Sequence, residues 1–182
     1  MANVVTIKGF DKVLTRLNAE IVAIENRSMK GMIMGASIVK KDMEKTPPLT
    51  PRDYGNLRSS FFIVTPKSIP SGSTPMFKGE VAGKMRTDHT STISEVRGMV
   101  KAASSIGKIK MLMLGYSASY ALFVHELLGM SDEPRWRYGP GPGKKRWYKP
   151  RVGAGPKWFE ASFKRNKDKI LQAIRLNVQI KK

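Results

Sequence analysis

The chain has few side chains that could carry catalysis. Of its 182 residues, two are histidine, fourteen are Asp or Glu, and none is cysteine. Disulfides, thiolate metal sites and cysteine nucleophiles are therefore excluded. His125-Glu126 matches the first half of a zinc-protease motif, but that motif needs a second histidine where this chain has Gly129. We therefore expect no metal site, and we interpret His125 as a packed or partly exposed histidine.

The glycine-rich stretch GPGPGKK at residues 139–145 is only superficially like a phosphate-binding loop. Such a loop holds phosphate with backbone N–H groups and has Ser or Thr after its lysine. Here two prolines remove donors, and the residue after Lys144 is Lys145. The few carboxylates form no convincing pair on one face for general acid–base work. We therefore expect a non-enzymatic chain without a cofactor.

Charge is the property in which this sequence departs most from the average. Lys and Arg number 33, which gives a net charge of +19. Residues 131–182 hold fifteen of these cations against four acids, and residues 1–130 hold eighteen against ten. Self-repulsion of this size indicates an anionic partner. Nucleic acid is the first candidate and an acidic protein surface the second. A membrane surface is the third, because the sequence shows no clear basic amphipathic helix.

Cations alternate with aromatic rings in the segment 135–151. Such mixtures suit phosphate backbones and exposed bases. The alternative is a solvated loop whose aromatic rings anchor it to its own domain or to a neighbouring subunit, and the sequence leaves both open. No motif for sequence-specific reading is present. The candidate contact residues are Arg135, Trp136, Arg137, Lys144, Lys145, Arg146, Trp147, Lys149 and Arg151.

Apolar spacing predicts the elements that must position these residues. Helical periodicity covers residues 10–24 and 29–45, with a break or bend at 26–28, and the prolines at 47 and 48 end it. A short buried helix is expected over 119–128 and a last helix from Pro156, whose ring suits the first helical turn. The expected strands are 3–8, 57–64, 77–83, 93–100 and 108–115, with an exposed hairpin tip at 84–92.

These elements predict one α+β domain over residues 1–182. We expect a mostly antiparallel sheet, with a long N-terminal helix and a C-terminal helix packed on it. Long loops are expected at about 66–107 and 129–154. No apolar run reaches the roughly 20 residues of a membrane-spanning helix, and the N-terminus does not read as a secretory signal.

Three segments together resemble one protein family. They are TPP at 46–48 followed by YGNLRSS at 54–60, then SYALFVHE at 119–126, and finally GPKWFEA at 155–161. In order and spacing they are similar to the neck, or tail-completion, proteins of long-tailed double-stranded DNA phages, also described as minor capsid or tail-component proteins. The residues that match its motifs are Gly55, Leu57, Arg58, Tyr120, Ala121, Val124, Glu126, Pro156 and Phe159. The chain departs from the family at Tyr54, where Thr is usual, and in its longer loops.

The resemblance implies a structural role in the virion. It implies a homo-oligomeric ring between the head connector and the tail terminator, around the channel through which the genome leaves. Its expected partners are further copies of the chain, those two neighbouring rings and genomic DNA in the channel, with no membrane contact. The expected location is the head–tail junction of a virion assembled in the host cytoplasm. The alternative from charge alone is a free basic nucleic-acid-binding protein.

Overall fold

The computed structural model of the chain describes residues 10–52, 55–66, 75–106, 110–126, 135–138, 145–148 and 151–179. For Phe10 and for the two short strands after residue 134, it describes the backbone alone. The fold is α+β, as the sequence predicts. In chain order its elements are α1 (Phe10–Lys45), α2 (Asn56–Ser59), β1 (Phe61–Val64), α3 (Ala82–Ile106), β2 (Met113–Tyr116), α4 (Ala121–Glu126), β3 (Arg135–Tyr138), β4 (Lys145–Tyr148) and α5 (Trp158–Val178).

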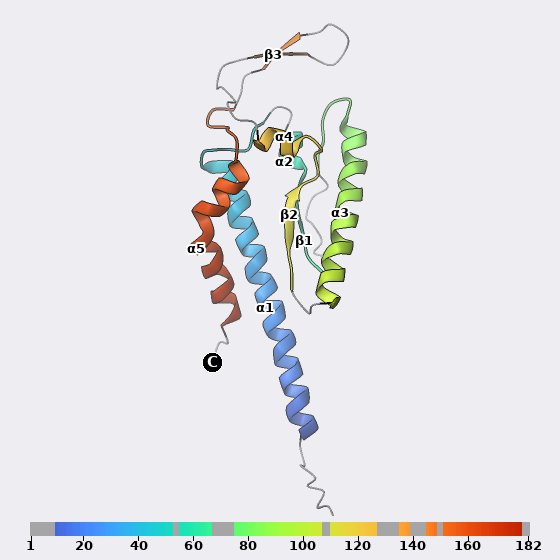
Figure 1. The fold of residues 1–182 in the computed structure, drawn as a ribbon, viewed down its shortest axis with the longest axis vertical. Coiled ribbons are helices and arrows are strands. Elements are labelled where there is room, and N and C mark those ends of the chain that lie inside the picture. The colour runs from blue at the N-terminus through green and yellow to red at the C-terminus, as the bar shows by residue number, and fades with distance from the viewer. Residues whose placement is uncertain are drawn as a thin grey trace, which may run out of the picture.

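Helix α1 is continuous over 36 residues. The expected break at 26–28 is absent, because Asn, Arg and Ser all keep the backbone donor that an α-helix needs. The helix ends where predicted: the Thr46 N–H still donates to the Asp42 carbonyl at 2.8 Å, and proline follows at position 47. In Figure 1, the N-terminal part of α1 extends well beyond the rest of the fold.

Helix α5 runs antiparallel along the C-terminal half of α1 (Figure 1). Two glycines on α1 allow the close approach. A Cβ placed on Gly31 would lie 2.7 Å from the Cα of Ile174, and one on Gly35 would lie 2.9 Å from Cγ2 of Ile170. Only a residue without a side chain lets the two helices come this near.

Strands β1 and β2 form an antiparallel pair, with Phe61 opposite Tyr116 and Val64 opposite Met113. In Figure 1 this pair lies between α1 on one side and α3 on the other. The core is formed where the C-terminal half of α1 meets the ends of the other elements. Its buried members are Val39, Met43, Leu57, Ala118, Ala121 and Trp158.

The largest error of the sequence analysis is the segment 77–106. Residues 77–81 are irregular and α3 occupies residues 82–106, so neither the strands at 77–83 and 93–100 nor the hairpin tip at 84–92 exists. The inward residues Met85, His89 and Val100 are separated by multiples of helical spacing, and this signal was overlooked. The expected loop at 66–107 is therefore mostly helix.

Smaller boundaries also differ. Residues 56–59 form the helical turn α2, so the predicted strand 57–64 shortens to β1, and the strand expected at 108–115 shortens to β2. Helix α4 is present, but it is not fully buried, because Leu122 and Phe123 are exposed. The predicted loop 129–154 contains the antiparallel pair β3–β4. The expected strand at 3–8 lies outside the described residues.

Candidate functional site

The three segments that carry the family resemblance meet at one place in the fold. Segment 54–60 supplies α2, whose Leu57 lies in the same buried cluster as Ala121 of α4 and Trp158 of α5. The Lys157 N–H donates to the His125 carbonyl at 2.8 Å, and the Ser117 N–H donates to the Ser60 carbonyl at 3.0 Å. We call this meeting point of the loop 46–60, α4 and the start of α5 the junction.

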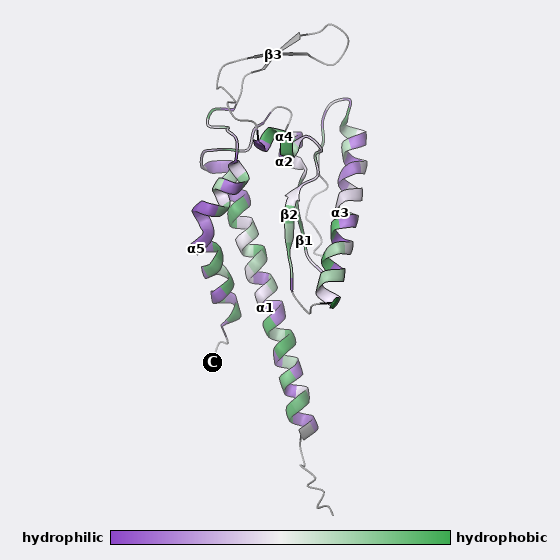
Figure 2. Cartoon of the chain, in the orientation of Figure 1, coloured by the Kyte–Doolittle hydropathy of each residue, from purple (hydrophilic) through white to green (hydrophobic). Residues whose placement is uncertain are grey.

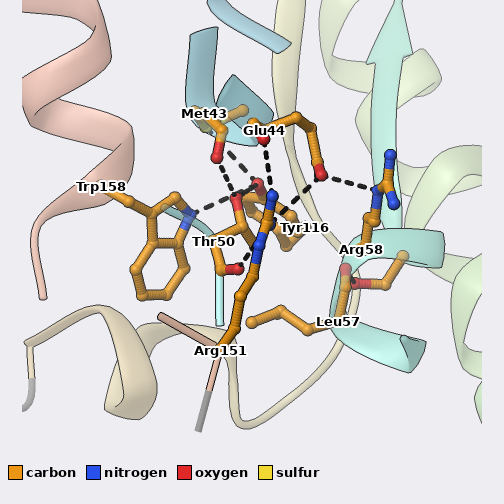
Figure 3. A network of polar contacts seen from close by, with 9 residues as sticks. Met43, Glu44, Thr50, Leu57, Arg58, Tyr116, Arg151 and Trp158 are labelled. Atoms are coloured by element: carbon orange, nitrogen blue, oxygen red, sulfur yellow. Dashed lines mark hydrogen bonds and ion pairs between the residues drawn. The ribbon is translucent and has the colours of Figure 1, made fainter. Parts of the chain in front are cut away.

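One carboxylate organises the polar side of the junction (Figure 3). Glu44, near the end of α1, accepts from Arg58 Nε at 2.8 Å and lies 3.4 Å from Arg151 Nη1. Arg151 also donates to the Glu44 carbonyl at 2.6 Å and to the Thr50 carbonyl at 3.2 Å. Glu44 is only 16% exposed in its side chain, so its ion pairs are less screened than surface pairs. They tie the helix end to two loops.

Tyr116 organises the apolar side of the same junction. Trp158 Nε1 donates to the Tyr116 hydroxyl at 3.3 Å, and the Thr50 hydroxyl lies 3.4 Å from it (Figure 3). Burial raises the pKa of Tyr116, although these hydrogen bonds act in the opposite direction. The Tyr116 ring also packs edge-on against Phe61, Trp158 and Phe159. The phenol therefore links the sheet to α5 through both its ring and its hydroxyl.

Glu126 connects α4 to the start of α5. Its carboxylate accepts from Lys157 Nζ and lies 2.8 Å from His125 Nδ1. The Lys157 hydrogen bond, with a smaller contribution from His125, lowers the pKa of Glu126. The His125 ring packs edge-on against fully buried Trp158, with centroids 4.9 Å apart. His125 is therefore packed, which agrees with its interpretation from the sequence.

Arg165 of α5 holds the C-terminal end of α1. It donates to Asp42 Oδ2 at 2.6 Å, to the Pro47 carbonyl at 2.9 Å and to the Thr46 carbonyl at 3.3 Å. A cation at the end of a helix satisfies carbonyls that have no partner within the helix. Burial alone would raise the pKa of Asp42, but its hydrogen bonds, with Arg165 first, bring that pKa below its usual value.

The motif residues themselves occupy structural positions. Gly55 has φ of +87°, which only glycine adopts without strain, and Leu57 is 5% exposed. Ala121 is buried and Val124 and Phe159 pack on the core, whereas Tyr120 is 40% exposed. α5 begins at Trp158 rather than at Pro156, and Lys157 precedes it in the left-handed region with φ of 58°.

The structure also forms a Ser–His pair that no sequence motif predicts. His89 Nδ1 of α3 lies 2.7 Å from the Ser117 hydroxyl, although 28 residues separate them in the chain. Nucleophilic catalysis needs a base held by a third group and open to substrate. His89 is instead 7% exposed under the edge of Phe77, and burial lowers its pKa. This arrangement suits a link between α3 and the chain after β2.

The described residues hold neither a metal-binding cluster nor a membrane-spanning helix. Their His, Asp and Glu side chains form no group of three that could hold a metal ion. None of the helices described is both long and apolar enough to cross a membrane.

A cationic stripe runs along the outer face of α1, and the sequence analysis missed it. It consists of Lys12, Arg16, Arg27, Lys30, Lys41 and Lys45. Successive members are 4, 11, 3, 11 and 4 residues apart, all near whole numbers of helical turns. The stripe therefore occupies one side of the helix over about 50 Å. All members but Arg27, which pairs with Glu20, are exposed. The spacing of these cations is the feature of the sequence that predicts the stripe.

The predicted contact residues are only partly placed by the structure. In the backbone pairing of β3 with β4, Trp136 lies opposite Trp147 and Arg137 opposite Arg146. Arg135 and Lys145 belong to the same strands, whereas Lys144 and Lys149 lie outside the described residues. Arg151 is the exception, because its guanidinium binds Glu44 and Thr50 within the chain. That residue serves the junction.

Comparison with known proteins adds no relative. No protein-family model, no curated protein sequence and no solved structure matches this chain.

Proposed function

We propose that this chain is a structural subunit of the head–tail junction of a long-tailed double-stranded DNA phage. In this role, copies of it form a ring around the DNA exit channel, between the head connector and the tail terminator. The subunit is not an enzyme, needs no cofactor and works in the assembled virion.

The observation that carries this proposal is the junction within the fold, where residues 46–60, α4 and the start of α5 meet. The three matching segments are spread over residues 46–161, yet each contributes a side chain to one buried cluster and to the ion pairs around it. Three short chance matches would have no reason to meet in space. Their residues hold helix ends and loops together, which suits a framework that must keep its shape under load.

Labelling of the virion tests the proposal. Particles of the phage that encodes the chain would carry a C-terminal affinity tag on this protein and a gold-conjugated ligand for it. Negative-stain images should show label at the head–tail junction, and untagged particles should show none. Label spread over the head or the tail, or absent from purified particles, would contradict the proposal.

The cationic stripe favours a second candidate, a free nucleic-acid-binding protein. Each phosphate contact contributes about 0.9 to the slope of log affinity against log salt. In gel shifts on duplex DNA, Lys41→Glu with Lys45→Glu should then lower both affinity and slope. Lys84→Glu with Lys101→Glu on α3 is the matched control, because it makes the same change in charge elsewhere. Equal losses from both pairs, or no shift of the unaltered chain at about 50 mM salt, would exclude this candidate.

A further inference from the structure

The N-terminal part of α1 is an apolar helix without a packing partner among the described residues. We call residues 10–24 the arm. Every residue from 11 to 22 is exposed, and the arm projects beyond α5 and beyond β1–β2 (Figure 1). The ion pair of Lys110 with Glu25, 2.9 Å apart, lies just past its end. In Figure 2, hydrophobic segments recur along this projecting part.

The apolar residues of the arm follow a coiled-coil pattern. Phe10, Leu14, Leu17, Ile21 and Ile24 are separated by 4, 3, 4 and 3 residues, which places them on one seam. The large aliphatic side chains Val13, Leu14, Leu17, Ile21 and Val22 are between 44% and 64% exposed. Exposed apolar patches of this extent mark interaction surfaces in water.

The seam continues into the part of α1 that α5 already covers. Counting on from Ile24 in the same alternation of four and three residues reaches Gly31, Gly35 and Asp42. Gly31 and Gly35 lie against α5, and Asp42 binds Arg165 of α5. One seam therefore runs the length of α1. Its C-terminal half holds a helix, and its N-terminal half stands open where α5 ends at Val178.

We infer that the open half of the seam binds the arm of a second copy of this chain. This inference rests on the proposed function in one respect, that copies of the chain meet in an assembly, and it names the surface by which they do so. Continuity with the α1–α5 contact indicates that the occupant is a helix. The arm of another copy is a helix with the same complementary spacing.

Area and charge both agree with this occupant. The four exposed aliphatic residues on or beside the seam, Val13, Leu14, Leu17 and Ile21, present about 400 Å² on one arm, so two arms together can bury at most about 800 Å², the size of a weak contact. The arm holds two acids, Asp11 and Glu20, and two cations, Lys12 and Arg16, so its net charge is zero. The whole chain is +19. Two copies can therefore approach through their arms with the least repulsion.

Sedimentation velocity of the full chain tests the inference. The unaltered chain should associate at tens of micromolar, and Leu17→Glu with Ile21→Glu should weaken association about 100-fold or more. Ala19→Glu with Ala23→Glu is the matched control. It has the same spacing and change in charge, but it lies on the side of the arm away from the seam. We expect this control to associate like the unaltered chain, and both variants to melt like it, since the arm lies outside the core.

Three results would overturn the arm interface. The unaltered chain could remain monomeric at about 100 µM, the seam variant could associate as well as the unaltered chain, or the control could fail equally. The arm and the head–tail junction are separable. Label at the head–tail junction of virions that carry the seam variant would refute the arm interface alone. Association through the seam by a chain that is absent from virions would refute the virion role alone.

Discussion

A methyl group added at Gly31 tests whether α5 packs on α1 as described. The new Cβ would lie 2.7 Å from the backbone Cα of Ile174 and 3.1 Å from the Ala173 carbonyl oxygen. Backbone atoms cannot rotate away as a side chain can, so the helices must separate. Overpacking of this kind costs about 1–3 kcal/mol. Replacing glycine by alanine within a helix recovers about 1 kcal/mol through propensity. Because the clash is with backbone atoms, its cost lies at the upper end of that range, and Gly31→Ala should destabilise the chain by up to about 2 kcal/mol.

The same substitution at Gly98 is the matched control. Gly98 lies within α3, and a Cβ placed on it would have no heavy atom within 4 Å. Gly98→Ala should therefore stabilise the chain by about 0.5–1 kcal/mol through helix propensity alone. The two variants share one chemical change and should differ in sign.

Thermal unfolding followed by circular dichroism at a single protein concentration measures both effects. For a chain of this size, 1 kcal/mol shifts Tm by about 2–4 °C. We expect Tm to fall by up to about 4–8 °C for Gly31→Ala and to rise by about 1–4 °C for Gly98→Ala. A rise for both variants would refute the close contact between α1 and α5. A fall for both would show that α3 is not the open helix described above.

Three further predictions concern the core, the pH dependence of stability, and the cations at and after β4. Leu57→Asp places a carboxylate in the buried cluster and should abolish cooperative unfolding in a circular dichroism melt. Arg58→Ala should only lower Tm. A melt of Leu57→Asp equal to that of the unaltered chain would contradict the assignment of Leu57 to the core. Burial lowers the pKa of His89 in the folded chain below 6.5, the value in the unfolded chain. The stability that neutral His89 contributes is therefore complete above about pH 6.5, and it is lost as the pH falls from there through the pKa of the folded state. Tm should therefore drop between pH 7.5 and 5.5 and drop less in His89→Gln; an identical pH dependence of the two would refute the role of His89. Arg146→Ala with Lys149→Ala should leave Tm within about 1 °C of the unaltered value and lower DNA binding or incorporation into virions, because we predict that these cations contact a partner and substitutions away from packed sites have small effects on stability. A melt like that of Leu57→Asp would place those residues in the core.

The sequence by itself determined the fold class, the two long terminal helices and the proline-enforced end of α1. These follow from local rules, because helical periodicity and a missing backbone donor act within a few residues. The absence of cysteine and the charge of +19 need no structure at all.

Tertiary structure decided what depends on distant residues. The segment 77–106 contains both alternating and helical patterns, and only packing of Met85, His89 and Val100 on the sheet and its loops selects the helix. The sequence alone places Arg151 among the partner-binding cations, but in the structure it binds Glu44, 107 residues away. The spacing of the seam likewise continues along the whole of α1 in the sequence. Where α5 ends decides which half of that seam is filled and which is left for a second chain.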